Sequence, residues 1–386
     1  AAIHGGDALA ALNLDPALTQ LAEDIKDRNF IPALIQDLLL DNGHQVRLTL
    51  APDEHMSKRR DDSEKQRLDI LLKSMNDEQR QSVVEQTAAL LERQSQEDDA
   101  SILPEVTRQD IPATQFIAEP TVSNKDLGWN FYGAGTNGLV YHQLVIDWPQ
   151  LNVSQLPYLN LLAQLMTELG IGEQDYLAVQ AKQAAVCGSL SAYLSYRGQA
   201  TNADQLKAYF VLSTKGLVSQ QTAIVDLLKD TLLSVRFDEK QRVKELVGQL
   251  RSRRQQSVGQ SGHSFALGAA SRNMSAGANL AFNVSGLQGL IWLQQLDDSL
   301  KDEKCLSDLC QQLTALQEQL GKQPLQLASV GEKLQQSHIE STFTSAFSEQ
   351  VGALKGDVQW AFNKAHTQAN YQPIQQLWTT NTQVNY

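Results

Sequence analysis

The chain contains few of the residues that build an active site. Its 386 residues include only three cysteines, Cys187, Cys305 and Cys310. Three cysteines cannot all pair within one chain, and Cys305 and Cys310 stand five residues apart on an expected helix, where they point in different directions. We therefore expect free thiols and favour a reducing compartment, either the cytoplasm or an organelle matrix.

The histidines do not have the spacing of a helical metal site. The seven are His4, His44, His55, His142, His263, His338 and His366. None stands four residues from another, and none has a glutamate beside it in HExxH or HxxEH, the spacings that put two imidazoles and a carboxylate around one zinc ion. A Gly-x-Ser-x-Gly elbow for a serine nucleophile is also missing. The sequence thus predicts no metal ligand and no catalytic residue, and it leaves the substrate-binding residues unknown.

Three isolated residues are candidates for a functional role. His142 stands in an expected strand, where we interpret it as an ordinary packed or exposed side chain. His263 begins a helix, where its ring caps or packs, with substrate contact as the lesser alternative. Cys187 precedes Gly188 between a helix and a strand and is interpreted as a buried structural thiol.

Long apolar runs and clustered positive charge are also lacking. No apolar run approaches the roughly 20 residues needed to span a bilayer. The formal net charge of −12 argues against nucleic-acid and anionic-membrane partners. The one dense basic cluster, Lys58–Arg60, is followed by Asp61 and is expected to be a solvated helix start. The N-terminus does not have the pattern of a signal peptide and does not begin with Met, which suggests a cleaved or truncated chain.

The most distinctive segment is a charge-dense arm. Residues 51–100 hold 13 Asp or Glu and 8 Lys or Arg. Two apolar stripes at helical spacing run through them, and Asn76 or Asp77 can cap the second helix. This pattern predicts an antiparallel helical hairpin with solvent-exposed, charged outer faces. Its apolar stripes are expected to be buried against each other or against a neighbouring segment. The stripes are Leu68, Leu71, Leu72 and Met75, then Val83, Val84, Leu90 and Leu91.

Residues 14–50, which precede the charge-dense segment, have three expected elements. Residues 14–40 have helical periodicity, which Pro32 is expected to break into two helices. Asp41–Gly43 is a turn signal, and the alternating residues His44–Leu50 predict a strand.

A glycine-rich segment after the arm raises the possibility of a nucleotide site. Trp129–Tyr132 and Leu139–Asp147 read as strands flanking Gly133–Gly138, which matches Gly-x-Gly-x-x-Gly. A dinucleotide loop requires a helix after the glycines, because the helix N-terminus faces the pyrophosphate. A strand-like run follows instead, so we expect a β-hairpin with a glycine-rich turn.

The remaining pattern alternates pairs of strands with groups of helices. This order predicts an α+β fold, a mainly antiparallel sheet covered by helices. The expected helices are 156–169, 176–185, 219–234, 238–257, 263–300 and 334–350, and the expected strands are 189–196, 206–213 and 325–330.

Several short motifs, taken in order, resemble the presequence protease-like branch of the pitrilysin/insulinase zinc metallopeptidase family. They run over nearly the whole chain, and their order is more specific than any one of them. The motifs are Ile3–Asp7, Leu40–Asp53, Asp99–Pro104, Asp110–Pro112, Thr136–Tyr141, Pro157–Tyr158 with Leu169–Gly170, and Ser261–Ser264 with Ser285–Gly286.

The resemblance implies that this chain is part of a larger peptidase. Family members have four homologous α+β domains in two halves, joined by a helical hairpin. The N-terminal half carries HxxEH and a downstream glutamate that bind zinc, and the last domain supplies an arginine and a tyrosine that reach the substrate. Neither element is present here, so no zinc ligand or catalytic residue is carried over, and the chain alone is expected to be inactive.

By this resemblance the chain falls into five parts. They are the tail of a preceding domain (1–13), a helical hinge arm (14–100), a linker (101–112), a non-catalytic pitrilysin-type domain (113–370) and the start of a following domain (371–386). The implied partners are the N-terminal catalytic half in cis, with its zinc, and unfolded peptide substrates. The alternatives are a free-standing non-catalytic subunit that binds peptides or a protease, and a plain structural adaptor.

Overall fold

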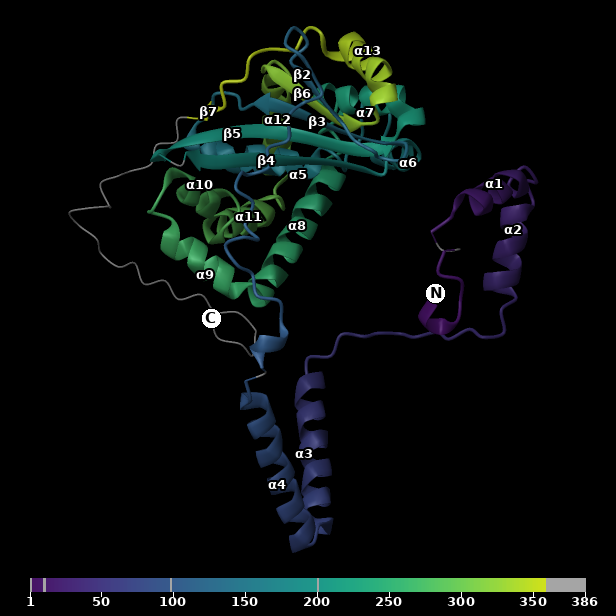
Figure 1. The fold of residues 1–386 in the computed structure, drawn as a ribbon, viewed down its shortest axis with the longest axis vertical. Coiled ribbons are helices and arrows are strands. Elements are labelled where there is room, and N and C mark those ends of the chain that lie inside the picture. Colours follow the sequence, from purple (N-terminus) through teal and green to yellow (C-terminus); the bar gives the residue numbers. More distant parts are fainter. Residues whose placement is uncertain (1, 10–11, 98, 200, 359–386) are drawn as a thin grey trace, which may run out of the picture. The chain divides into compact units, whose positions relative to one another are not determined.

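The computed structural model describes residues 2–9, 12–97, 99–199 and 201–358. The chain divides into two compact units, Ala1–Pro112 and Ala113–Tyr386, here called the N-terminal and C-terminal units (Figure 1). His366 and the expected start of a following domain at 371–386 lie outside the described residues. No described helix is long and apolar enough to cross a membrane.

The N-terminal unit consists of helices joined by extended chain. The elements are η1 (Ala2–His4), α1 (Asp15–Asp24), α2 (Phe30–Ile35), η2 (Gln36–Leu40), α3 (Met56–Ser74), α4 (Asp77–Ser95) and η3 (Ala100–Ile102).

Two expectations for this unit were wrong. The helical run breaks before Phe30 and not at Pro32, because Pro32 is the third residue of α2, where a backbone N–H has no partner within the helix. His44–Leu50 is not a strand. Every strand pairing among the described residues lies in the C-terminal unit, so this alternating segment has no partner strand for its backbone.

The predicted helical hairpin is confirmed. Asn76 forms a capping box at the start of α4: Gln79 N donates to Asn76 Oδ1 at 2.8 Å, and Asn76 N donates to Gln79 Oε1 at 3.0 Å. Arg80 joins the two helices by donating to Leu72 O at 2.9 Å. The apolar stripes stay largely exposed, with Leu71 at 49% and Leu90 at 57%, so the described helices do not bury them against each other.

The C-terminal unit is built on one sheet in the order β1-β2-β6-β3-β5-β4, with β7 pairing β5 (Figure 1). Adjacent strands are antiparallel except β2 and β6, which are parallel. The strands are β1 (Val122–Asn124), β2 (Trp129–Gly133), β3 (Leu139–Asp147), β4 (Ser189–Gln199), β5 (Asn202–Leu217), β6 (Leu325–Gly331) and β7 (Asp357–Val358).

The expected hairpin of Trp129–Tyr132 with Leu139–Asp147 was wrong. β6 lies between β2 and β3 and pairs with both, so Gly133–Gly138 is a connection past β6 and not a tight turn. Asn137 and Gly138 have positive φ values of 51° and 77° there, which explains the Asn-Gly dipeptide. The two strands expected at 189–196 and 206–213 are confirmed as β4 and β5, which pair with each other.

Helices make up the rest of the unit. They are α5 (Leu156–Leu165), α6 (Tyr176–Val186), α7 (Gln221–Leu233), α8 (Lys240–Gln260), α9 (Gly262–Ser271), α10 (Ala276–Val284), α11 (Leu287–Ser299), α12 (Glu303–Leu320) and α13 (Gln336–Phe347), with short 3-10 turns η4 (Val153–Gln155), η5 (Val218–Gln220) and η6 (Lys333–Gln335).

The helical stretch expected over 263–300 consists of three helices, α9, α10 and α11. Ser275 caps α10, with Ala278 N donating to its Oγ at 3.1 Å, so the chain restarts a helix there. A Cβ on Gly286 would lie 2.8 Å from the Cα of Phe282, and only glycine permits the close turn between α10 and α11.

The helices cover one face of the sheet. Alternate residues of β3, such as Leu144 and Ile146, join one buried apolar cluster with residues of α5, α7, α8, α10, α12 and α13. The alternate set on the other face is exposed or half-buried, apart from Val211 and Asp147, which are 4% and 7% exposed and lie outside that cluster. We call this second face the open face. The fold is thus α+β, a mostly antiparallel sheet with a helical layer on one side.

Candidate functional site

The described residues contain no group of three or more His, Cys, Asp or Glu that could hold a metal ion. The described histidines of the N-terminal unit are exposed, as are His263 and His338, and His142 is buried. No described histidine belongs to a group of residues that could hold a zinc ion.

His142 is the centre of a buried hydrogen-bond chain. Its ring is 1% exposed, with Nε2 at 2.8 Å from Gln221 Oε1 and Nδ1 at 3.0 Å from Ser329 Oγ. The Gln221 oxygen can only accept, so Nε2 carries the proton and Nδ1 accepts from the serine hydroxyl. Trp129 Nε1 donates to the same hydroxyl at 3.0 Å, and Gln221 Nε2 donates to Thr342 Oγ1 at 3.0 Å.

This chain of hydrogen bonds is structural. It links β2, β3, β6, α7 and α13, and burial lowers the pKa of His142 from 6.5 to about 4, so the ring is neutral. The interpretation of His142 as a packed strand histidine is confirmed. Its partners are 79 and 187 residues away in sequence, and no local motif marks them.

Burial disfavours the thiolate form at two of the three cysteines. Cys187 and Cys310 have pKa values raised by burial, which disfavours the thiolate that a nucleophile needs. Cys187 is half-buried, and its Sγ donates to Gln183 O at 3.4 Å. The three cysteines are free.

The open face presents tyrosines and small polar groups. Tyr141 on β3 is 41% exposed and Tyr193 on β4 is 38% exposed. Gln143 Nε2 lies 3.5 Å from the Tyr193 hydroxyl, at the limit of a hydrogen bond. Ser191 is exposed on the same face of β4. Such a surface offers apolar ring area and hydrogen-bonding groups together.

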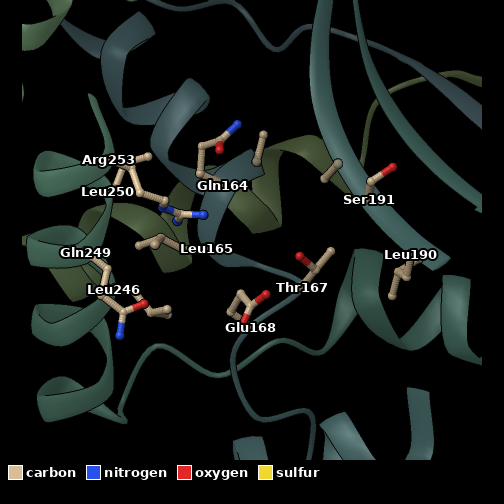
Figure 2. A pocket seen from close by; sticks show the side chains of 12 residues that line it. Gln164, Leu165, Thr167, Glu168, Leu190, Ser191, Leu246, Gln249, Leu250 and Arg253 are labelled. Carbon is tan, nitrogen blue, oxygen red and sulfur yellow. The ribbon is translucent and has the colours of Figure 1, made fainter. Parts of the chain in front are cut away.

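A pocket of about 270 Å³ opens beside β4, where that strand ends the sheet (Figure 2). We call it the edge pocket. Its lining comes from the end of α5 and the chain just after it, from the start of β4, and from α8. The lining residues are Ala163, Gln164, Leu165, Thr167, Glu168, Leu190, Ser191, Ala192, Leu246, Gln249, Leu250 and Arg253.

The edge pocket has buried leucines at its base, and most of its accessible lining is polar. Leu165, Leu246 and Leu250 are buried, whereas Gln249 and Arg253 are exposed on α8. Glu168 is compensated, because its Oε2 accepts from Arg242 Nη2 at 3.3 Å and from Gln180 Nε2 at 3.1 Å. Arg253 forms no ion pair among the described residues, so the pocket mouth carries an uncompensated positive charge.

Comparison with known families gives a match over much of the chain. The family model described as Peptidase M16-C associated matches residues 50–296. The match begins just before α3 and ends within α11, so it includes the hairpin and most of the sheet.

The curated relatives are much longer than the region they share with this chain. A mitochondrial presequence protease of Danio rerio is 24% identical over 295 residues, covering 76% of this chain and 29% of that protein. A chloroplastic and mitochondrial presequence protease of Arabidopsis thaliana is 24% identical over 298 residues, covering 74% and 27%. The chain thus spans less than a third of the length of these relatives.

Among solved structures, similarity is weaker. A peptidase M16 inactive domain from Pseudomonas fluorescens is 17% identical, covers 58% of this chain and 49% of that one, and gives a TM-score of 0.38. The first half of a periplasmic protease from Escherichia coli is 11% identical, covers 62% and 48%, and gives a TM-score of 0.42.

Proposed function

Because the chain belongs to the Peptidase M16-C associated family, we propose that it is the non-catalytic segment of a longer zinc-dependent metalloendopeptidase that degrades unfolded peptides. In that protein the N-terminal unit links the two halves, and the C-terminal unit forms part of the wall of a closed substrate chamber. The catalytic half, in cis, holds the zinc.

The observation that carries the proposal is the extent of the family match. Residues 50–296 run across the division between the units at Pro112. The α3–α4 hairpin and the sheet therefore belong to one family region, as expected if the hairpin connects this sheet to another part of a longer chain. A gating role for such a connection is to let the halves open for substrate and close around it.

Exposed apolar residues in the N-terminal unit support a longer parent protein. Leu18 and Leu38 are each 57% exposed, and Leu68 on α3 is 50% exposed. Large apolar surfaces on a folded protein mark places where another segment or chain packs. We propose that the rest of the parent protein covers them.

The open face is the part of the C-terminal unit that we assign to the chamber wall. Helices cover the opposite face, so only this side of the sheet is accessible. Its tyrosine rings and hydroxyl groups can contact peptides of many sequences, so we expect low sequence specificity. The free thiols fit our further proposal that the protein works in a reducing compartment.

Photo-crosslinking in the longer parent protein tests this function. A photo-crosslinking amino acid at Tyr141 or Tyr193 is expected to label an unfolded peptide substrate, and the same group at Glu318, exposed on α12 of the helical layer, is not. Labelling from Glu318 alone would contradict the assignment of the open face.

Activity of the 386-residue chain gives an independent test. We expect no hydrolysis of an unfolded peptide, with or without added zinc, because the described residues hold no zinc-binding cluster. Zinc-dependent turnover by this chain that a chelator abolishes would refute the non-catalytic assignment. An open reading frame that starts and stops with this chain would favour a free-standing subunit instead.

A further inference from the structure

We propose that the free edge of β4 binds an extended peptide as an added β-strand, with one acidic side chain of the peptide in the edge pocket. The inference deepens the proposed function and rests on it, because it says where the chamber wall would hold an unfolded peptide. It depends on three observations: which residues of each strand bond to which neighbouring strand, the position of the pocket, and the charge at its mouth.

The alternation of hydrogen bonds across the sheet shows which backbone groups of β4 have no partner strand. Val218 N donates to Gly138 O at 2.9 Å, so the even-numbered residues of β5 bond to β3. In an antiparallel ladder successive residues bond to opposite sides, so the odd-numbered residues of β5 bond to β4. On the other side of β3, Asp147 N donates to Pro324 O at 3.1 Å, so the odd-numbered residues of β3 bond to β6, as the same alternation requires.

It follows that the even-numbered residues of β4 point their N–H and C=O groups away from the sheet. These residues are Leu190, Ala192, Leu194 and Tyr196. β4 is the last strand in the sheet order, and β7 pairs with β5 and not with β4. A strand of 11 residues with such a row of free groups is a template for another strand.

The pocket lies in register with these groups. Leu190 and Ala192 both line it, and they are residues whose backbone groups face the free edge. In a strand paired antiparallel with β4, the residue opposite Ala192 exchanges two hydrogen bonds with it and shares its face of the sheet. Its side chain therefore points toward α5 and α8, into the edge pocket (Figure 2).

The lining favours a polar or acidic side chain. The accessible lining is mainly polar, because Gln249 and Arg253 are exposed whereas Leu246 and Leu250 are buried, and a volume of about 270 Å³ is enough for a glutamate. Arg253 at the mouth has no ion-pair partner in the described chain and would repel a lysine or arginine at this position. The neighbouring peptide residues point to the open face, where Tyr193 and Ser191 provide sequence-tolerant contacts.

Two variants separate backbone pairing from pocket filling. Ala192→Pro removes an outward N–H and keeps the β5 ladder, because Ala192 does not bond to β5. Gln249→Trp blocks the pocket mouth from an exposed position, and Gln255→Trp places the same side chain on α8 outside the lining. With a fluorescent, unstructured decapeptide carrying one central glutamate, the first two variants should weaken binding to the full chain about tenfold, as expected for the loss of one contact worth about 1.4 kcal/mol. Gln255→Trp should leave binding unchanged.

Peptide controls test the chemistry of the site. Replacing the central glutamate by lysine should weaken binding about tenfold, and so should N-methylation of alternate peptide amides, which removes strand donors. In hydrogen exchange, the amides of Leu190, Ala192 and Leu194 should become protected when the peptide binds.

Three results would overturn the inference. They are equal binding by the wild-type chain, Ala192→Pro and Gln249→Trp; edge amides already protected in the longer parent protein without peptide; and dimerisation through β4 that displaces the peptide. None of them would refute the proposed function, because a chamber wall can act without a strand-binding edge. Zinc-dependent turnover by this chain alone would refute that function without bearing on the binding data.

Discussion

At the scale of single residues, His142 shows how the sheet accommodates a titratable group without a catalytic use. Both nitrogens of its ring have partners, and the chain from Trp129 to Thr342 assigns each proton to one acceptor. Phe343 packs edge-on against the ring at 4.8 Å between centroids. A buried network of this kind favours one arrangement of strands and helices, because any slip leaves a polar group unpaired.

The network predicts a pH-dependent stability. The folded-state pKa of His142 is about 4, below the unfolded value of 6.5, so the unfolded state binds more protons between these values. The stabilisation is therefore complete above pH 6.5 and is lost as the pH falls toward 4. Urea unfolding followed by tryptophan fluorescence should show a loss of about 2 kcal/mol between about pH 7 and about pH 5 from this group.

His142→Gln provides the control for that measurement. The variant keeps a polar side chain but does not titrate in this range, so its stability should fall less over the same interval. An identical fall in the variant and the wild type would assign the pH dependence to other groups.

At the scale of elements, the hairpin offers a local test of its cap. Asn76→Ala removes the acceptor for Gln79 N and should cost about 1 kcal/mol, seen as a several-fold faster hydrogen exchange in the first turn of α4. Asn76→Asp keeps an acceptor at this position and should exchange like the wild type. Equal exchange in Asn76→Ala would mean that the capping box does not hold this helix end.

The elements also show what could be predicted from the sequence and what could not. Helices with a clear 3.6-residue period and the local β4–β5 hairpin are predictable, because their determinants lie within a few residues of one another. The prediction of a β2–β3 hairpin was wrong because β6, nearly 200 residues later in the chain, lies between the two strands and pairs with both. Local patterning does not carry that information.

The edge pocket could not be predicted from the sequence for the same reason. The edge pocket joins three segments, near Leu165, Ala192 and Leu250, that no motif connects. The absence of a helical zinc motif could be read directly, since that motif requires a fixed local spacing. The one signal for the free edge was the alternation of Ser189–Tyr196, which predicts a strand but not its place in the sheet.

At the scale of the whole molecule, the exposed leucines of the hairpin separate two ideas about the chain. If the hairpin is only a solvated arm, its apolar stripes do not pack against another part of the protein. If it joins the halves of a longer peptidase, those stripes pack against other parts of the protein. Leu71 and Leu91 are 49% and 61% exposed in this chain, so much of their apolar area is available to such a partner.

Replacing both residues by glutamine distinguishes these ideas. In the 386-residue chain, Leu71→Gln with Leu91→Gln should change the free energy of unfolding by less than about 1 kcal/mol, because little buried area is lost. In the longer parent protein the same pair should reduce peptide turnover severalfold, because the packing between the halves is weakened. A matched pair, Arg67→Gln with Glu92→Gln, alters exposed polar positions of the same helices and should leave turnover unchanged. If the leucine pair also leaves turnover unchanged, the stripes do not join the halves, and the hairpin is a passive tether.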